Sequence, residues 1–215
     1  MYYNKLTLEI KGQSMKEKNI LSGEIMLKPA AILLIVIFSS FLFYGINQAL
    51  AEKVQANSRA IEKLMAEAES HLQDASYDEA IAIYEDAIAI GPDNILAHQG
   101  AGKAYSLSEQ LEEAEAEFKK VLKIDPNYVP ALNNLADVYL RTGRPEEALE
   151  LINKAIEIEP QFSVLYQTCG EIYEAMDKYD LAIKMYGRAT HDPRFKKAAN
   201  EAIRRLKELM KEKGG

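Results

Sequence analysis

Cysteine and histidine are scarce in this sequence, which has one cysteine and three histidines among its 215 residues. A single cysteine excludes an intramolecular disulfide bond, and this is compatible with any redox compartment. Cys169 stands where its helical pattern requires an apolar residue, so we expect a buried, unreactive thiol. His71, His98 and His191 are far apart in the chain and show no metal-ligand spacing with acidic residues or with Cys169. The sequence therefore predicts no metal site.

Motifs for catalysis or for nucleotide binding are also lacking. Residues 100–103 (GAGK) superficially resemble a phosphate-binding loop. That loop requires a glycine where Ala97 stands and a serine or threonine where Ala104 stands, so the resemblance fails. Paired glutamates such as Glu112 and Glu113 fit first helical turns, where their charge favours the helix dipole, better than acid/base roles. We find no nucleophile paired with a base, and we expect no enzymatic activity, no cofactor and no small-molecule substrate.

Positive charge is sparse over most of the chain. The net charge is −7, although residues 1–28 carry +2 and residues 194–213 carry +5. Residues 29–193 therefore carry −14. Binding of nucleic acid requires a basic surface that neutralises phosphates, so this balance argues against a nucleic-acid partner.

Charge is absent altogether from a run of 23 residues, Pro29–Ala51. From Ala30 to Phe43 the only polar side chains are those of Ser39 and Ser40. At a rise of about 1.5 Å per residue, a helix of this length crosses a hydrocarbon core of roughly 30 Å. The sequence therefore predicts that residues 29–51 insert into a membrane.

Two fates are open for this segment. If it is not cleaved, residues 29–51 form a transmembrane anchor, which the long preceding region counted from Met1 favours. If it is cleaved, it is a signal peptide, because residues 49–51 (ALA) have the small-x-small form of a signal-peptidase site. A start at Met26 would then place Lys28 as the basic residue before the apolar run. No cysteine directly follows that run, which excludes a bacterial lipoprotein.

The tail before this segment, residues 1–28, shows no sustained periodicity and is predicted to be poorly ordered. Met15 and Met26 are alternative starts to Met1. Lys28 directly precedes the apolar run, although the nearby basic residues are equal in number on its two sides. Both fates leave the rest of the chain outside the cytoplasm. We expect a single-pass protein of the bacterial cytoplasmic membrane with an extracytoplasmic body or, alternatively, a soluble periplasmic protein.

The region after residue 60 repeats every 34 residues, and residues 129–162 show the unit most clearly. Apolar residues at i, i+3, i+4 and i+7 predict a first amphipathic helix, with Leu132, Leu135, Ala136 and Tyr139 on one face. Gly143 is expected to end this helix, and Pro145 to begin a second one that Pro160 closes. The predicted unit is a helical hairpin.

Four classes of position recur at this interval. They are a small residue (Ala68, Gly102, Ala136, Gly170), an alanine (Ala80, Ala114, Ala148, Ala182), a large residue (Tyr84, Phe118, Ile152, Tyr186) and a proline (Pro92, Pro126, Pro160). Small residues let helix axes approach closely, and large ones fill the space beside them. This pattern resembles the tetratricopeptide repeat family over residues 61–192. The resemblance implies an all-α solenoid of stacked hairpins in a right-handed superhelix, here preceded by one N-terminal transmembrane helix.

The repeat interval sets the predicted domain limits. A helical linker, residues 52–60, leads into a degenerate first repeat, residues 61–94. Three further repeats cover residues 95–128, 129–162 and 163–192, the last of them truncated. An amphipathic basic segment, residues 193–215, is expected to cap the last exposed face.

The resemblance also implies where a partner binds, because in this family the first helix of each hairpin lines the concave face. The predicted groove residues are the non-core positions of those helices: Gln99, Lys103, Ser106, Leu107, Asn133, Asn134, Asp137, Leu140, Arg141, Gln167, Glu171 and Glu174. Mixed amides, charges and isolated leucines suit an extended peptide or a helix of a partner protein better than a metabolite.

One subtype of the family is disfavoured. Repeat proteins that hold the carboxylate tails of heat-shock chaperones use a Lys/Asn, Asn, Lys/Arg clamp, and only Asn134 agrees at the matching positions (Gln99, Lys103, Asn134, Val164, Thr168). We therefore expect a membrane-tethered scaffold that mediates protein–protein interactions in the assembly of a bacterial envelope complex. The alternative is a soluble periplasmic binding module released after Ala51.

Overall fold

The computed structural model describes residues 29–213, and for residues 29–33, 35 and 213 it describes the backbone only. The tail predicted over residues 1–28 lies outside the described residues. Helix α2 (Pro29–Gln73) is the first described element. The chain divides within it into two compact units, residues 1–55 and residues 56–215.

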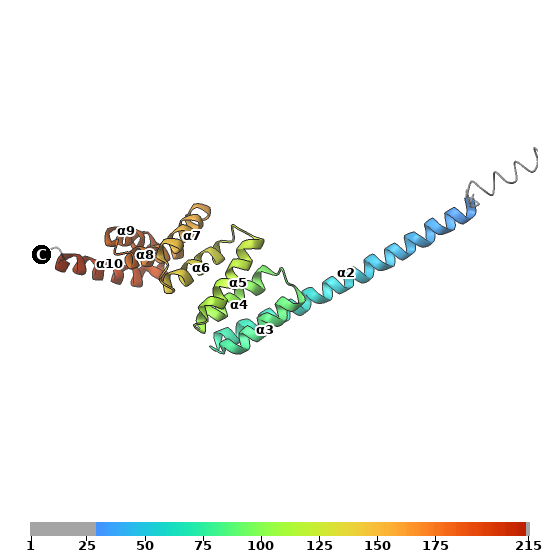
Figure 1. Cartoon of the computed structure of the whole chain (residues 1–215), viewed down its shortest axis with the longest axis horizontal. Coiled ribbons are helices and arrows are strands. Elements are labelled where there is room, and N and C mark those ends of the chain that lie inside the picture. The colour runs from blue at the N-terminus through green and yellow to red at the C-terminus, as the bar shows by residue number, and fades with distance from the viewer. Residues whose placement is uncertain (1–28, 214–215) are drawn as a thin grey trace, which may run out of the picture. The chain divides into compact units, whose positions relative to one another are not determined.

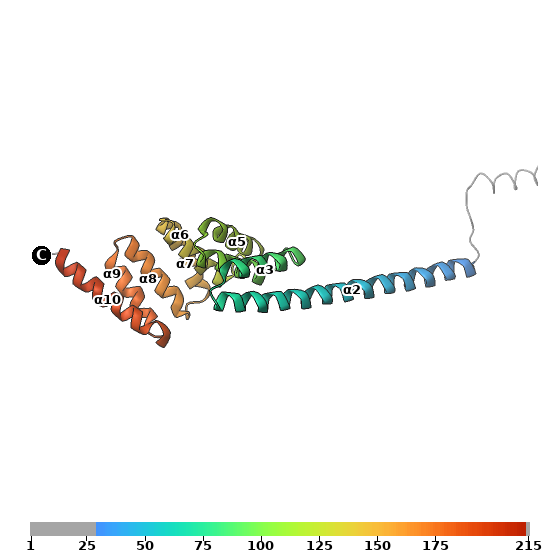
Figure 2. The ribbon, with the colours of Figure 1, turned by 90° about the horizontal axis from the view of Figure 1, so that it is seen from below.

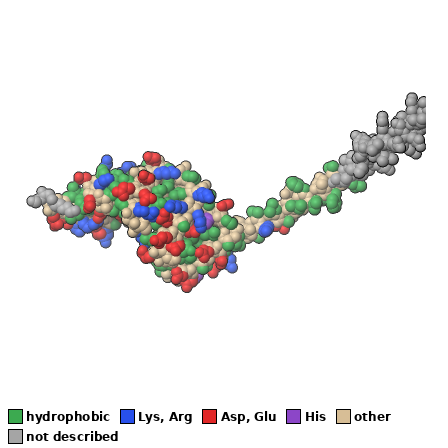
Figure 3. Space-filling view, in the orientation of Figure 1, with side chains coloured by type: hydrophobic (Ala, Val, Ile, Leu, Met, Phe, Trp, Pro, Cys, Tyr) green, Lys and Arg blue, Asp and Glu red, His purple; other side chains and the backbone are tan. Residues whose placement is uncertain are grey.

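In the first unit, the described side chains of α2 are all exposed. Phe38 and Phe41 are 71% and 73% exposed, and hydrophobic side chains predominate along this part of the helix (Figure 3). The hydroxyls of Ser39 and Ser40 both donate to the carbonyl oxygen of Val36, at 2.9 and 2.7 Å, so the helix satisfies them itself. Among the residues that were fully described, no helix is long and apolar enough to cross a membrane. The predicted span includes residues 29–33 and 35, whose side chains lie outside that set.

The second unit is a stack of short helices (Figures 1 and 2). After the end of α2 it contains α3 (Tyr77–Ile90), α4 (Ile95–Leu107), α5 (Leu111–Ile124), α6 (Val129–Arg141), α7 (Pro145–Ile158), α8 (Ser163–Ala175), α9 (Tyr179–Ala189) and α10 (Pro193–Lys213). Each helix packs on the next one in the chain from α3 to α10. The first helices of successive hairpins, α4, α6 and α8, also contact one another in that order, and α10 follows α8. The described residues thus form the all-helical solenoid that the repeat pattern predicts.

The close approach of paired helices depends on a small residue opposite a large ring. A Cβ atom added to Gly102 would lie 2.7 Å from the Phe118 ring, and one added to Gly170 would lie 2.6 Å from the Tyr186 ring. Both rings are almost wholly buried. The period-34 pattern of small and large residues therefore reflects direct contact within each of these hairpins.

The turn inside each hairpin repeats a backbone conformation. Ala75, Glu109, Gly143 and Asp177 are spaced 34 residues apart, and all four have positive φ angles between 57° and 75°. Gly143, the predicted helix stop, is the one glycine among them. Glycine adopts this left-handed conformation at no steric cost, whereas the other three residues adopt it against their preference.

Helix α10 covers the last hairpin. Ala199, Ala202 and Leu206 are buried against α8 and α9, together with Tyr186. The outer face of α10 is rich in exposed Lys and Arg, and acidic and basic side chains are interspersed over the rest of the visible repeat surface (Figure 3). The amphipathic pattern of the basic C-terminal segment therefore corresponds to one face packed on the solenoid and one face in solvent.

Candidate functional site

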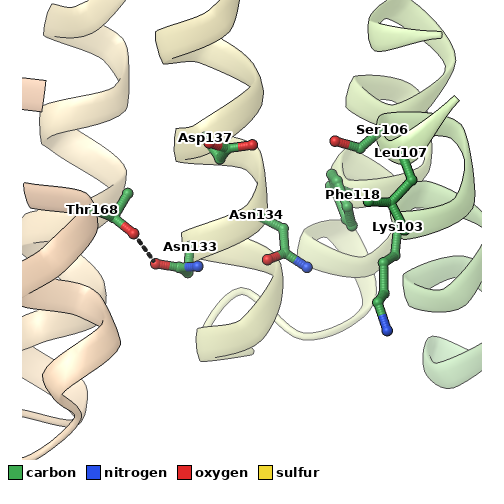
Figure 4. A pocket seen from close by; sticks show the side chains of 8 residues that line it. All are labelled: Lys103, Ser106, Leu107, Phe118, Asn133, Asn134, Asp137 and Thr168. Atoms are coloured by element: carbon green, nitrogen blue, oxygen red, sulfur yellow. Dashed lines mark hydrogen bonds between the residues drawn. The ribbon is translucent and has the colours of Figure 1, made fainter. Parts of the chain in front are cut away.

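A hollow of about 270 Å³, which we call the central hollow, lies across α4, α6 and α8 (Figure 4). Its lining residues are Lys103, Ser106, Leu107, Phe118, Asn133, Asn134, Asp137 and Thr168. Six of these eight are predicted groove residues, and they come from two successive first helices. The first helices of the hairpins therefore present a recessed polar surface.

A second hollow of about 670 Å³, the edge hollow, adjoins the first, because Asn133 and Asn134 line both. Its other walls include Tyr128 and Phe162, which directly precede α6 and α8, and Arg194 in the first turn of α10. Phe162 is 46% exposed there. The two hollows together offer a continuous surface long enough for several residues of an extended chain.

Two lining residues were missed by reasoning from the sequence. Phe118 belongs to a second helix, and it reaches the central hollow beside Gly102, which has no side chain to cover it. Thr168 is buried, and its hydroxyl donates to Oδ1 of Asn133 over 3.0 Å, linking α8 to α6. The absence of a side chain at position 102 is the sequence signal that could have identified Phe118.

Several predicted groove residues hold neighbouring repeats together rather than projecting freely. The guanidinium of Arg141 donates to the Ser106 hydroxyl at 2.8 Å and to a Glu109 carboxylate oxygen at 2.6 Å, both from the preceding repeat. Arg141 is a predicted groove residue, but these contacts bind it to the preceding repeat, so its side chain is not free to contact a ligand. Glu174 likewise accepts two hydrogen bonds from Arg205 of α10, at 2.6 and 2.9 Å.

Other predicted residues remain available. Leu107 is 46% exposed and lines the central hollow. Asn134 is directed across the hollow toward α4, whereas Asn133 points to Thr168 (Figure 4). Leu140 is half-buried and packs against the main core cluster.

The amides of Gln99 and Gln167 contain buried acceptors without a donor. Their Oε1 atoms are buried and have no hydrogen-bond partner among the described residues. The Nε2 atom of Gln167 donates to Glu171 over 2.8 Å. Unsatisfied buried carbonyl oxygens are uncommon in folded proteins, so they mark positions where a donor is missing.

Two of the predicted groove carboxylates, Asp137 and Glu171, are destabilised in their charged form. Burial raises the pKa of Asp137, and Arg141, whose guanidinium lies 3.7 Å away, opposes that effect only in part. Burial also raises the pKa of Glu171, the hydrogen bond from Gln167 opposes it, and the nearby charge of Asp137 adds to it. A cation placed beside these groups would therefore be favoured.

The histidine and cysteine side chains take structural positions. Both ring nitrogens of buried His98 have partners, Glu117 at 2.6 Å and the Pro92 carbonyl oxygen at 2.8 Å. Burial raises the pKa of the Cys169 thiol to about 11, so it stays protonated at neutral pH. No group of three or more metal-ligating side chains occurs within residues 29–213 as far as their side chains are described.

Comparisons with known proteins are consistent with this geometry. A tetratricopeptide repeat family model matches residues 71–119 and 108–168. No curated protein has significant sequence similarity to the chain.

Many solved structures share the fold. TTC0263, a thermophilic TPR protein of Thermus thermophilus, is 20% identical with a TM-score of 0.61, over 66% of this chain and 81% of that one. MamA is 20% identical with a TM-score of 0.59, over 70% of this chain and 82% of its own. YrrB, described as a TPR protein with an unusual peptide-binding site, is 20% identical with a TM-score of 0.56, over 73% and 84% of the two chains.

Proposed function

Since the hairpins over residues 71–168 are tetratricopeptide repeats, we propose that this chain is a protein-interaction scaffold. It binds a peptide or helix of a partner protein in the groove formed by the central and edge hollows. It is tethered to the bacterial cytoplasmic membrane by residues 29–51, with its repeats outside the cytoplasm, and it assists the assembly of an envelope complex.

The observation that carries the binding function is the recessed surface across α4, α6 and α8. Its lining combines amides, charges and the exposed apolar side chain of Leu107, which is the mixture that an extended polypeptide requires. The hollows are open rather than enclosed, and their lining residues include no catalytic constellation. The peptide-binding site named in the description of YrrB gives independent support for this kind of ligand on this fold.

Photocross-linking from the groove tests the binding function. A photoreactive phenylalanine analogue at Leu107 of the full chain, irradiated in native membranes, should give a discrete adduct with the partner. Leu181 is the matched control, because it is also a leucine, is 41% exposed and lies on α9 away from the central hollow. Equal adducts from both positions, or adducts from Leu181 alone, would place the partner site elsewhere.

The proposed tether rests on the apolar run of residues 29–51. The described side chains in this run are exposed and largely hydrophobic, and both serine hydroxyls are satisfied by the backbone. Internal satisfaction of polar groups is what a hydrocarbon environment demands. The alternative is a signal peptide cleaved after Ala51, which would release a soluble periplasmic module.

Membrane extraction followed by amino-terminal sequencing separates the two fates. An anchored chain should remain in the pellet after washing with alkaline carbonate, with residues 29–51 intact. Soluble protein that begins at Glu52 would eliminate the anchor and establish the cleaved form.

A further inference from the structure

Two sets of equivalent positions run along the first helices of the hairpins, each with a spacing of 34 residues, and Lys103, Asn133 and Asp137 among them line the central hollow. Gln99, Asn133 and Gln167 form an amide ladder on α4, α6 and α8. Four residues further along each helix, a charge ladder contains Lys103, Asp137 and Glu171. Residues four apart lie one turn apart on the same helical face, so the two ladders are neighbours.

The charge ladder extends beyond these helices to Glu69 of α2 and Arg205 of α10, and its ends are neutralised. Glu69 lies 3.7 Å from Lys103, and Arg205 binds Glu174 at 2.6 Å. In the order of the repeats the charges are therefore negative, positive, negative, negative and positive. The step from Asp137 to Glu171 is the one at which two like charges are adjacent.

Among the described residues Asp137 has an ion-pair partner in Arg141, and Glu171 has none. Arg141 is 3.7 Å from Asp137 and is held by shorter hydrogen bonds to Ser106 and Glu109. Within the described part of the chain Glu171 forms no ion pair, and its one hydrogen bond there comes from the Gln167 amide. Like charges side by side in a partly desolvated groove repel each other, so this step attracts a positive group from outside the chain.

The amide ladder supplies an independent indication of a donor. The Oε1 atoms of Gln99 and Gln167 are buried without a partner among the described residues, and both are acceptors. The middle member, Asn133, has its oxygen satisfied by Thr168. Each of these two unsatisfied amides therefore lies one helical turn before a member of the charge ladder, on α4 and on α8.

We propose that the groove binds an extended segment of a partner protein that places a lysine or arginine side chain between Asp137 and Glu171. This deepens the proposed function, because it assigns a chemical class to the occupant of the same groove. The cation of the segment completes the alternation of charge along the ladder. Crossing from α4 to α8 spans two helix spacings of about 8–10 Å each. At about 3.3 Å per residue, an extended segment of roughly six residues covers that distance.

Peptide binding to the full chain in a nonionic detergent tests this assignment. The probes are three fluorescent peptides of about eight residues that alternate alanine with lysine, glutamine or glutamate, and binding is measured by fluorescence anisotropy. The lysine peptide should bind about tenfold tighter than the glutamine peptide, and the glutamate peptide should bind weakest. The preference should decrease with added salt, because the contact is between charges near the surface.

Two isosteric variants locate the contact. Asp137→Asn and Glu171→Gln should each reduce affinity for the lysine peptide about fivefold and leave affinity for the glutamine peptide unchanged. Glu157→Gln is the control, because it removes one negative charge from the exposed surface of α7. If all three variants weaken binding equally, the attraction is diffuse and the assignment is wrong.

The remaining outcomes separate this inference from the proposed function. Equal binding of the lysine and glutamine peptides, or no binding of the lysine peptide, overturns the basic specificity. If the photoreactive analogue at Leu107 still cross-links to a partner, the proposed binding function of the groove stands without the basic specificity. If the lysine preference depends on Asp137 and Glu171 while Leu107 gives no adduct, the specificity of the site stands and the scaffold function is wrong.

Discussion

At the scale of single residues, the packing of two of the hairpins depends on the absence of a side chain. Gly102 and Gly170 leave room for Phe118 and Tyr186, whereas the third hairpin pairs Ala136 with the smaller Ile152 at the equivalent positions. Small and large residues therefore compensate each other in these three hairpins, whereas the first hairpin combines Ala68 with Tyr84. The same absence of a side chain brings Phe118 to the floor of the groove.

Gly170→Ala should destabilise the protein by about 1–2 kcal/mol, because the new methyl group would overpack against the buried Tyr186 ring. Gly187→Ala is the matched control on the partner helix α9, where nothing lies within 4 Å of an added Cβ atom. It should stabilise by up to about 1 kcal/mol through helix propensity. Urea denaturation followed by circular dichroism measures both changes. If Gly170→Ala also stabilised the protein, the Tyr186 ring would have moved aside without cost.

At the scale of elements, the turn between the helices of each hairpin has one geometry and four different residues. Positive φ at Ala75, Glu109 and Asp177 shows that packing imposes the turn even where the residue disfavours it. Gly143 is the only one of the four residues whose type indicates a left-handed turn in the sequence. The turn geometry is thus a property of the hairpin, and a glycine occupies the left-handed position in one repeat of four.

Ala75→Gly and Gly143→Ala should change stability in opposite directions. The first removes a left-handed alanine with φ 57°, and we expect a gain of less than about 1 kcal/mol after the added entropy of the unfolded chain. The second forces an alanine to φ 75° where no neighbouring atom is within 4 Å, so we expect a loss of about 1 kcal/mol from the backbone alone. Denaturant midpoints of the two variants and the parent chain provide the measurement. A loss of stability in Ala75→Gly would contradict the interpretation.

At the scale of the whole stack of repeats, each hairpin is stabilised mainly by the hairpins next to it. Each hairpin contacts chiefly the adjacent ones, and α10 takes the place of the next first helix. It buries Ala199 and Leu206 against the last hairpin and supplies Arg205 to Glu174. The end of the stack is therefore protected by a helix that is not part of a hairpin.

Deletion of residues 194–215 should loosen the C-terminal end of the stack selectively. Uncovering about 200 Å² of apolar surface costs roughly 5 kcal/mol at about 25 cal/mol per Å². In a linear array this loss falls on the nearest unit, so amide hydrogen exchange should accelerate in α8 and α9 and stay close to that of the full chain in α4 and α5. Uniform acceleration along the chain would show that the repeats unfold as a single cooperative unit. Unchanged exchange would show that α10 is not a cap.

The sequence by itself determined the repeat interval and the helical hairpins. These follow from local rules that act over a few helical turns. The rules are the apolar periodicity, the glycine and proline residues that end helices, and the alternation of small and large residues. Helices begin at Ile95, Val129 and Ser163, at the start of each interval read from the sequence. Six lining residues of the central hollow are among the positions that the resemblance to the tetratricopeptide repeat family implies for the concave face.

Only the tertiary structure decided which groove residues are paired. The contacts of Arg141 with Ser106, of Asn133 with Thr168 and of Glu174 with Arg205 join residues 31–35 positions apart. Such contacts depend on the stagger of neighbouring first helices and on side-chain conformations, and a periodic pattern contains neither. The pattern places Lys103, Asp137 and Glu171 in one row, but only the packing of adjacent repeats leaves the last two without a cation between them among the described side chains.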